Sequence, residues 1–248
     1  MSSFQVIQSS DAEPPLPARF ERYLFNEPHH LRGQSAAGAK TFFLINSETN
    51  TAEARLSLFV RESEALSPLR ATFGGIEAAP DLPYEALDSL LDAVEKWAVS
   101  QNLTSIRLTQ WPAAYAPELA IRVDHRLKAG GYQPLFTEKN QHLDLTRPLI
   151  LHVSARRRFR KAEGAGFVFE EWKTPDWETA HAFLHAARTR KSLPLSLTAV
   201  ELRNLGENCP EEIFVFTVCD GLALAALGVV IRLNARILYH FLPADSAE

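Results

Sequence analysis

The residues best suited to chemistry are five cations within six positions: Arg156, Arg157, Arg158, Arg160 and Lys161. Guanidinium groups pair bidentately with phosphate oxygens, so this run could bind a phosphorylated ligand. The alternative is the solvated face of a helix that joins two domains, because charge runs usually face solvent. An RNA-binding protein is a further interpretation that rests on this run alone, and it ranks last.

Other polar side chains give weaker signals. Arg188, Arg190 and Lys191 close a predicted helix, where cations match the helix dipole or border a binding loop. His181 and His185 have the i, i+4 spacing of zinc ligands. The general-base Glu of HExxH and a third ligand with suitable spacing are both missing, so no metal site is predicted. Nucleophile elbows, Walker loops and G-x-G-x-x-G turns are also missing from the sequence.

Composition sets broad limits on the class of protein. The chain has 248 residues, 46% of them hydrophobic, and a net charge of −4. The cation run therefore stands on a background without overall attraction to nucleic acid or anionic membranes. The two cysteines lack metal-type spacing, and neither a signal-peptide pattern nor an apolar stretch long enough to span a bilayer is visible. We expect a cytoplasmic protein without a membrane span.

Hydrophobic periodicity predicts a mixed α/β chain. Within residues 80–103, six apolar side chains fall on one helical stripe: Leu87, Leu90, Leu91, Val94, Trp97 and Ala98. The cation run is expected on a helix at 155–163, with Ser154 as N-cap and Gly164 or Gly166 as its end. Further helices are expected at 19–31, from 117, at 176–192 and at 198–209. Strands are expected at 40–46, 53–62, 70–78, 105–111, 167–172, 213–221, 222–234 and 235–243, with a strand pair between 132 and 145.

This order of elements resembles that of the GNAT acyltransferases, and two such units in one chain resemble the Fem-type (FemAB/FemX-like) aminoacyltransferases. The resemblance covers roughly residues 40–248. It rests on SIRLTQWPAAY, LKAGGYQPLFTEKNQHLDL, VSARRRFRKAEGAGFVFEEW, RTRKSLPLSLTAVELRNL and EEIFVFTVCDGLALAALGVVIRLNARILYHFLPADSAE. It implies an α/β fold (α+β, mixed sheet) of two GNAT-like units, 1–150 and 151–248, with mostly antiparallel sheets flanked by helices.

Two departures from the GNAT pattern stand out. GNAT enzymes bind the pyrophosphate of acyl-CoA in a Gly-rich turn at a helix N-terminus. The matching place in the first unit reads GGIEAAPDLP, where Glu77 and Asp81 would repel phosphate, so we expect no CoA there. In the second unit the turn would follow ADSAE, so we expect this unit to be incomplete and the chain to be a fragment of a longer protein.

The resemblance implies transfer of an acyl or aminoacyl group to an amine by direct attack, without a metal. Tyr239 and His240 would lie on the strand beside the acyl donor, as base or proton donor, with only one of them in the cleft. Phosphates of the substrate would meet the cations Arg156, Arg157, Arg160, Lys161, Arg190 and Lys191.

The resemblance also implies that no cofactor would be bound tightly. Acyl-CoA or aminoacyl-tRNA would be the co-substrate, and in the second case the protein would contact the acceptor end of the tRNA. The amine that receives the acyl group would belong to a small molecule or a cell-envelope precursor. The alternative is a catalytically inactive GNAT-derived binding or scaffold module.

Overall fold

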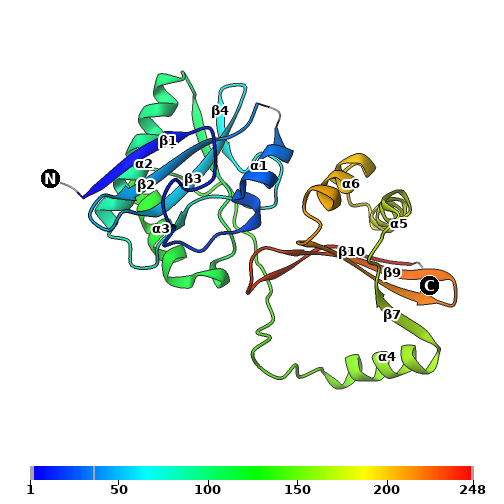
Figure 1. Cartoon of the computed structure of the whole chain (residues 1–248). Helices are drawn as coiled ribbons and strands as arrows, with labels where there is room; N and C mark the ends of the chain where they lie inside the picture. Colours follow the sequence, from blue (N-terminus) through cyan, green and yellow to red (C-terminus); the bar gives the residue numbers. More distant parts are fainter. Residues whose placement is uncertain (1–2, 36, 247–248) are drawn as a thin grey trace. The chain divides into compact units, whose positions relative to one another are not determined.

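The chain folds as two compact units, Met1–His142 (unit 1) and Leu143–Glu248 (unit 2) (Figure 1). The computed structural model describes residues 3–35 and 37–246. The predicted fold class is confirmed, because unit 1 contains a mixed sheet and unit 2 an antiparallel sheet, both flanked by helices. The boundary at 150 expected from the sequence lies inside unit 2. Each unit is described by itself below.

Unit 1 has a sheet in the order β1-β2-β3-β4-β6, with β5 paired to β3. Its neighbours are antiparallel except β4 and β6, which are parallel and are joined through the crossover helix α2. The elements are β1 (Phe4–Ser9), η1 (Leu24–Asn26), α1 (Pro28–Gln34), β2 (Lys40–Asn46), β3 (Thr51–Arg61), β4 (Glu64–Ser67), β5 (Glu77–Ala78), α2 (Tyr84–Ser100), β6 (Ser105–Leu108), η2 (Ala113–Tyr115) and α3 (Pro117–Ala129).

The central strands of unit 1 are covered on both faces. Phe42 and Leu44 of β2 lie in the core beneath α2, whereas Phe43 lies in a second cluster with Phe20. This burial on both sides explains the uninterrupted apolar run of β2. All six residues of the predicted stripe on α2 are buried, so the helix period identified the core face correctly.

The second face of β3 contains buried charge in addition to the apolar side chain of Phe59. The Arg55 side chain is fully buried and donates from Nε to Oε2 of Glu77 over 2.6 Å, directly across the β3–β5 pair. It also donates to Glu27 at the start of α1 and to the Ala12 carbonyl oxygen. Burial raises the pKa of Glu77, against the opposing effects of the Arg55 guanidinium and the Tyr23 amide. This single cation therefore ties three other segments to β3.

Unit 2 is a four-stranded antiparallel sheet in the order β10-β9-β8-β7. Helix α5 packs against β9 and β10 and contacts α6, so these helices cover one face of the sheet (Figure 1). Residues of β8 alternate accordingly, with Val215 buried and Phe216 half-buried. The elements are α4 (Val153–Gly164), β7 (Phe167–Glu171), α5 (Trp177–Arg190), α6 (Ala199–Asn208), β8 (Ile213–Asp220), β9 (Ala223–Arg232) and β10 (Leu238–Asp245).

Helix termini in unit 2 follow local sequence signals with one exception. Thr198 and Glu201 form a capping box on α6, and the Asp176 side chain caps α5. Helix α4 begins two residues earlier than predicted: its N-cap is His152, whose ring accepts from the Ser154 amide, so Ser154 lies inside the helix. Gly166 adopts a positive φ of 87° just beyond the helix, as a chain reversal after a helix requires.

Several predicted elements of unit 1 are wrong. The helix expected at 19–31 is replaced by η1 and α1, because Pro28 holds the preceding residue extended and a helix can only begin there. The strand expected at 70–78 shrinks to β5, while β1 and β4 were missed. No strand pair forms between 132 and 145, since that described segment pairs with no strand.

No helix in the described ranges 3–35 and 37–246 is long and apolar enough to cross a membrane.

Replacing Arg55 tests the buried ion pair of unit 1. We expect R55M to destabilise unit 1 by about 3–5 kcal/mol, because it leaves the Glu77 carboxylate buried without its partner. The double variant R55M/E77L should recover much of this loss. Urea unfolding followed by tryptophan fluorescence measures both, with Trp97 and Trp111 reporting on unit 1 and Trp172 and Trp177 on unit 2. R107Q is the control, because the Arg107–Glu64 pair is exposed and should change stability by less than about 1 kcal/mol. A loss of that small size for R55M would contradict the central role of this cation.

The close packing of α6 on α5 generates a second prediction. A Cβ at Gly206 would overlap the Trp177 ring, so G206A should destabilise unit 2 by about 1–3 kcal/mol despite the higher helix propensity of alanine. G164A at the end of α4 is the matched control, because a Cβ there meets no atom within 4 Å. Thermal unfolding should show a lower Tm for G206A and an unchanged or slightly higher Tm for G164A. Equal effects of both variants would contradict the contact.

Candidate functional site

The candidate site of unit 2 is the outer side of β10, the strand that contains Tyr239 and His240. Strand β10 lies at one edge of the sheet and pairs only with β9 among the described strands. Its register shifts between His240 and Leu242, which marks a β-bulge at Phe241. Bulges re-aim side chains and leave backbone groups unpaired, and they are frequent beside functional sites.

The register decides which face each candidate side chain occupies. Tyr239 lies opposite Ile231, which is 1% exposed on the face that α5 covers. His240 lies opposite Val230, is exposed, and belongs to the other face. Directly paired residues point to the same side of a sheet, so the two candidates point to opposite sides. Tyr239 contacts the Phe241 ring at 5.9 Å between centroids, and only His240 faces solvent beside the bulge.

Gly228 lies beside the imidazole of His240. A Cβ at position 228 would lie 3.6 Å from His240 Nε2, which is an ordinary van der Waals distance, and no other atom would lie within 4 Å. Sequence reasoning missed this glycine, because the run LALAALGVVI indicates only a strand. The signal that could have found it is the glycine inside a strand, which often marks a close approach of another group.

The face around His240 is apolar and partly open. Phe216 stacks on Phe169 of β7 at 5.5 Å and contacts Phe214 at 6.4 Å, and the Arg232 guanidinium lies 5.7 Å from the centre of the Phe214 ring. Phe169 itself is strongly exposed. The imidazole therefore lies on the same face as a row of aromatic rings that could contact an apolar acyl chain.

Two of the six predicted phosphate-binding cations are engaged with an acidic residue. Arg190 Nη2 donates to the backbone oxygen of Asp245 over 2.8 Å, and Lys191 Nζ donates to the Asp245 carboxylate. The Lys191 hydrogen bond is the main cause that lowers the pKa of Asp245. These contacts join the end of α5 to the end of β10, so both cations have a structural role, and a phosphate would compete there with Asp245.

The other four predicted cations lie on α4 and are free of such pairs. Arg156, Arg157, Arg160 and Lys161 are all exposed, and no ion pair to them occurs within the described part of the chain. Among the described residues, no contact joins these four cations to Arg190 or Lys191. The predicted set of six therefore divides into an exposed group on α4 and a neutralised pair at the end of α5.

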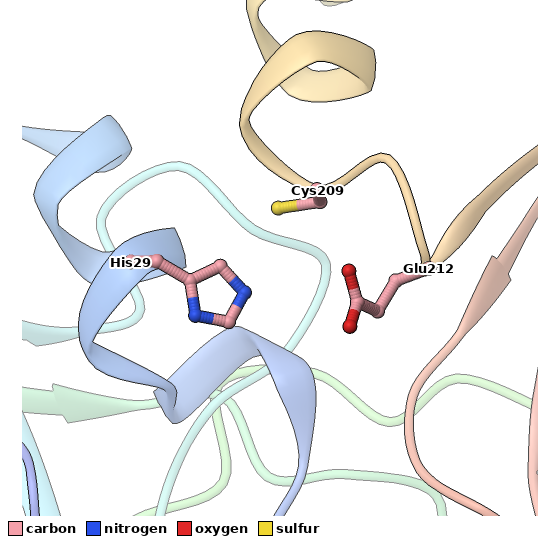
Figure 2. Close-up of side chains that lie close together, drawn as sticks. All are labelled: His29, Cys209 and Glu212. Atoms are coloured by element: carbon pink, nitrogen blue, oxygen red, sulfur yellow. The ribbon is translucent and has the colours of Figure 1, made fainter.

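His181, His185 and Cys209 of unit 2 make contacts within the fold. His181 and His185 stack with their ring centres 6.1 Å apart, and a ring nitrogen of His181 lies 3.0 Å from the Leu197 carbonyl oxygen. Figure 2 shows Cys209 and Glu212 on the turn between α6 and β8, and also His29, a residue of α1 in unit 1. Burial, with a contribution from Glu212, raises the pKa of Cys209 to about 11, so its thiol stays protonated and weakly reactive at neutral pH.

Within either unit taken alone, the described residues hold no group of three His, Cys, Asp or Glu side chains close enough to share one ion.

A scan of the chain against protein-family models gave no match, and a search of curated proteins also gave none.

The pairing of Lys191 with Asp245 predicts a titration shift. In K191Q the pKa of Asp245 should rise toward the ordinary aspartate value, because the hydrogen bond that favours the ionised carboxylate is lost. NMR titration of the Asp245 carboxyl carbon measures this shift. R188Q is the control, since Arg188 lies on the same helix turn but makes no recorded ion pair with Asp245. An Asp245 pKa that is the same in K191Q and the unsubstituted protein would contradict the pairing.

Proposed function

We propose that the chain is an N-acyltransferase-type protein of the GNAT, Fem-like kind, which transfers an acyl or aminoacyl group to an amine. The observation that carries this proposal is the open outer side of β10, where a bulge and the exposed His240 lie together. The edge of a sheet offers unpaired N–H and C=O groups to an extended ligand, and an amide-bearing acyl chain can bind there as an added strand.

A repeated succession of elements supports the tandem arrangement. In unit 1, β1 is followed by η1 and α1 and then by β2, β3 and β4; in unit 2, β7 is followed by α5 and α6 and then by β8, β9 and β10. Both sets of four strands are antiparallel and lie in sequence order. In unit 1 the fourth strand also pairs with β6, whereas β10 pairs with β9 alone among the described strands. The donor would bind in unit 2, because the exposed His240 lies on this strand.

The proposed reaction needs only positioning and one proton transfer. The amine nitrogen attacks the acyl carbonyl carbon, a C–N bond forms, and the C–S bond of a thioester or the C–O bond of an aminoacyl ester breaks. The imidazole of His240 accepts the ammonium proton and passes it to the leaving thiolate or alkoxide. Acyl-CoA or aminoacyl-tRNA would supply the acyl group, and both donors fit the cytoplasmic location that is part of the proposal. The acceptor would be an amine-bearing small molecule or cell-envelope precursor.

The second candidate is a GNAT-derived binding module without catalysis. Unit 1 favours this candidate, because Glu77 in the stretch GGIEAAPDLP forms a buried ion pair with Arg55. A carboxylate buried with its own cation is unsuited to bind a phosphate. Unit 1 would then act as a scaffold, and catalysis would depend on unit 2.

Acyl transfer is tested with a panel of acyl-CoA donors and primary amines by release of the free thiol, and in parallel with aminoacyl-tRNA by loss of the aminoacyl ester. We expect transfer by the unsubstituted chain and a fall in kcat of about 10²–10⁴-fold for H240Q, because the proton acceptor is lost. H185Q, which replaces an exposed histidine on α5, is the matched control and should keep full activity. The absence of transfer with every donor would favour the binding module, whereas equal rates for H240Q and the unsubstituted chain would contradict the role of His240 as proton acceptor.

A further inference from the structure

Helix α4 is a concentrated positive surface in a chain with a net charge of −4. The five cations between Arg156 and Lys161 are exposed, and no ion pair neutralises them among the residues that the structure describes. No residue of the helix is buried. Figure 1 shows α4 connected to the sheet of unit 2 through β7 and away from α5 and α6. Neither packing nor internal electrostatics explains this charge.

Apolar side chains are exposed at the same place. Leu149 and Ile150 lie just before the helix and Ile150 is 91% exposed, while Val153 forms its first residue and is half-exposed. Phe159 lies between two of the cations and is 60% exposed. Ala155, Phe159 and Ala162 share one face of the helix, as a period of 3.6 residues requires. A helix that served only as a solvated connection would gain nothing from leaving these side chains in water.

We propose that α4 and the segment from Leu149 to its N-terminus bind the surface of an anionic phospholipid bilayer. The cations would contact phosphate groups, and Ile150 and Phe159 would enter the boundary between headgroups and acyl chains. Basic helices with exposed apolar residues lie in this way in the plane of the interface. Clusters of four to eight Lys and Arg residues on amphipathic helices are typical of binding to acidic lipids. This inference does not depend on the proposed transferase activity.

The apolar residues distinguish a bilayer from a nucleic acid as the partner. Binding to single-stranded RNA combines cations with a series of aromatic platforms for the bases, and this segment has only Phe159. Leu149 and Ile150 would have no partner on a phosphate backbone. A bilayer satisfies both the cations and the aliphatic side chains, so it fits the surface better.

The test is co-sedimentation of the full chain with vesicles of phosphatidylcholine, with and without phosphatidylglycerol. We expect binding only to the anionic vesicles and a decrease with added salt, because counterions screen the headgroups. R156Q/R157Q/R160Q/K161Q should lower the partition coefficient by roughly two orders of magnitude or more, since each cation near an anionic surface contributes several-fold. I150S/F159S keeps every charge and should also weaken binding, at least about tenfold.

The control removes four exposed cations elsewhere: R32Q, K96Q, K139Q and K173Q. It changes the net charge by the same amount and should bind nearly as well as the unsubstituted chain. Circular dichroism of all variants checks that the fold is retained, which the exposure of the substituted side chains favours. Absence of binding to anionic vesicles, an equal loss in the control, or binding that I150S/F159S leaves unchanged would overturn the proposal. Salt-sensitive binding to transfer RNA without binding to vesicles would also overturn it and would identify α4 as a nucleic-acid contact.

Discussion

The organisation of unit 1 depends on the buried guanidinium of Arg55. Removing such a cation from water is unfavourable unless several acceptors surround it, and the structure supplies two carboxylates and a carbonyl oxygen. These acceptors come from β5, from the start of α1 and from the segment before residue 20, so that the chain can bury Arg55 only when all three segments are in place. The ion pair therefore restricts where the N-terminal segment lies, beyond any stability that it adds.

The parts of the fold that sequence could predict are those determined by neighbouring residues. The stripe on α2 and the strand β2 depend on local periodicity, and both are confirmed. The errors lie where distant segments decide the result. The short strand β5 pairs with β3 where Glu77 meets Arg55, 22 positions away in the sequence, and no local pattern reveals that pairing. Residues 132–145 alternate between apolar and polar side chains as strands do, but no described strand pairs with them. Alternation alone was therefore insufficient to predict strands there.

The candidate site shows the same limit at the scale of single side chains. The sequence could indicate that Tyr239 and His240 point to opposite faces, because alternation along a strand is local. It could not say which of them faces the open side, since this depends on the register with β9 and on the face that α5 covers. The bulge at Phe241 and the position of Gly228 beside His240 also arise from pairing between strands. Likewise, the pairing of Lys191 with Asp245 joins residues that are far apart in the sequence.

The two units differ in where their charged side chains lie, and this difference decides which charges are accessible to a ligand. In unit 1, Glu53, Arg55 and Glu77 are buried, and Arg55 and Glu77 neutralise one another as an ion pair. Among the described residues of unit 2, no charged side chain is buried. A buried ion pair cannot bind a charged ligand without losing its partner, which is unfavourable in a medium of low dielectric. An exposed cation exchanges only water and counterions when a ligand binds. The unpaired cations of α4 and the exposed imidazole of His240 are therefore able to meet a substrate or a surface, whereas the charges beneath the sheet of unit 1 are committed to the fold.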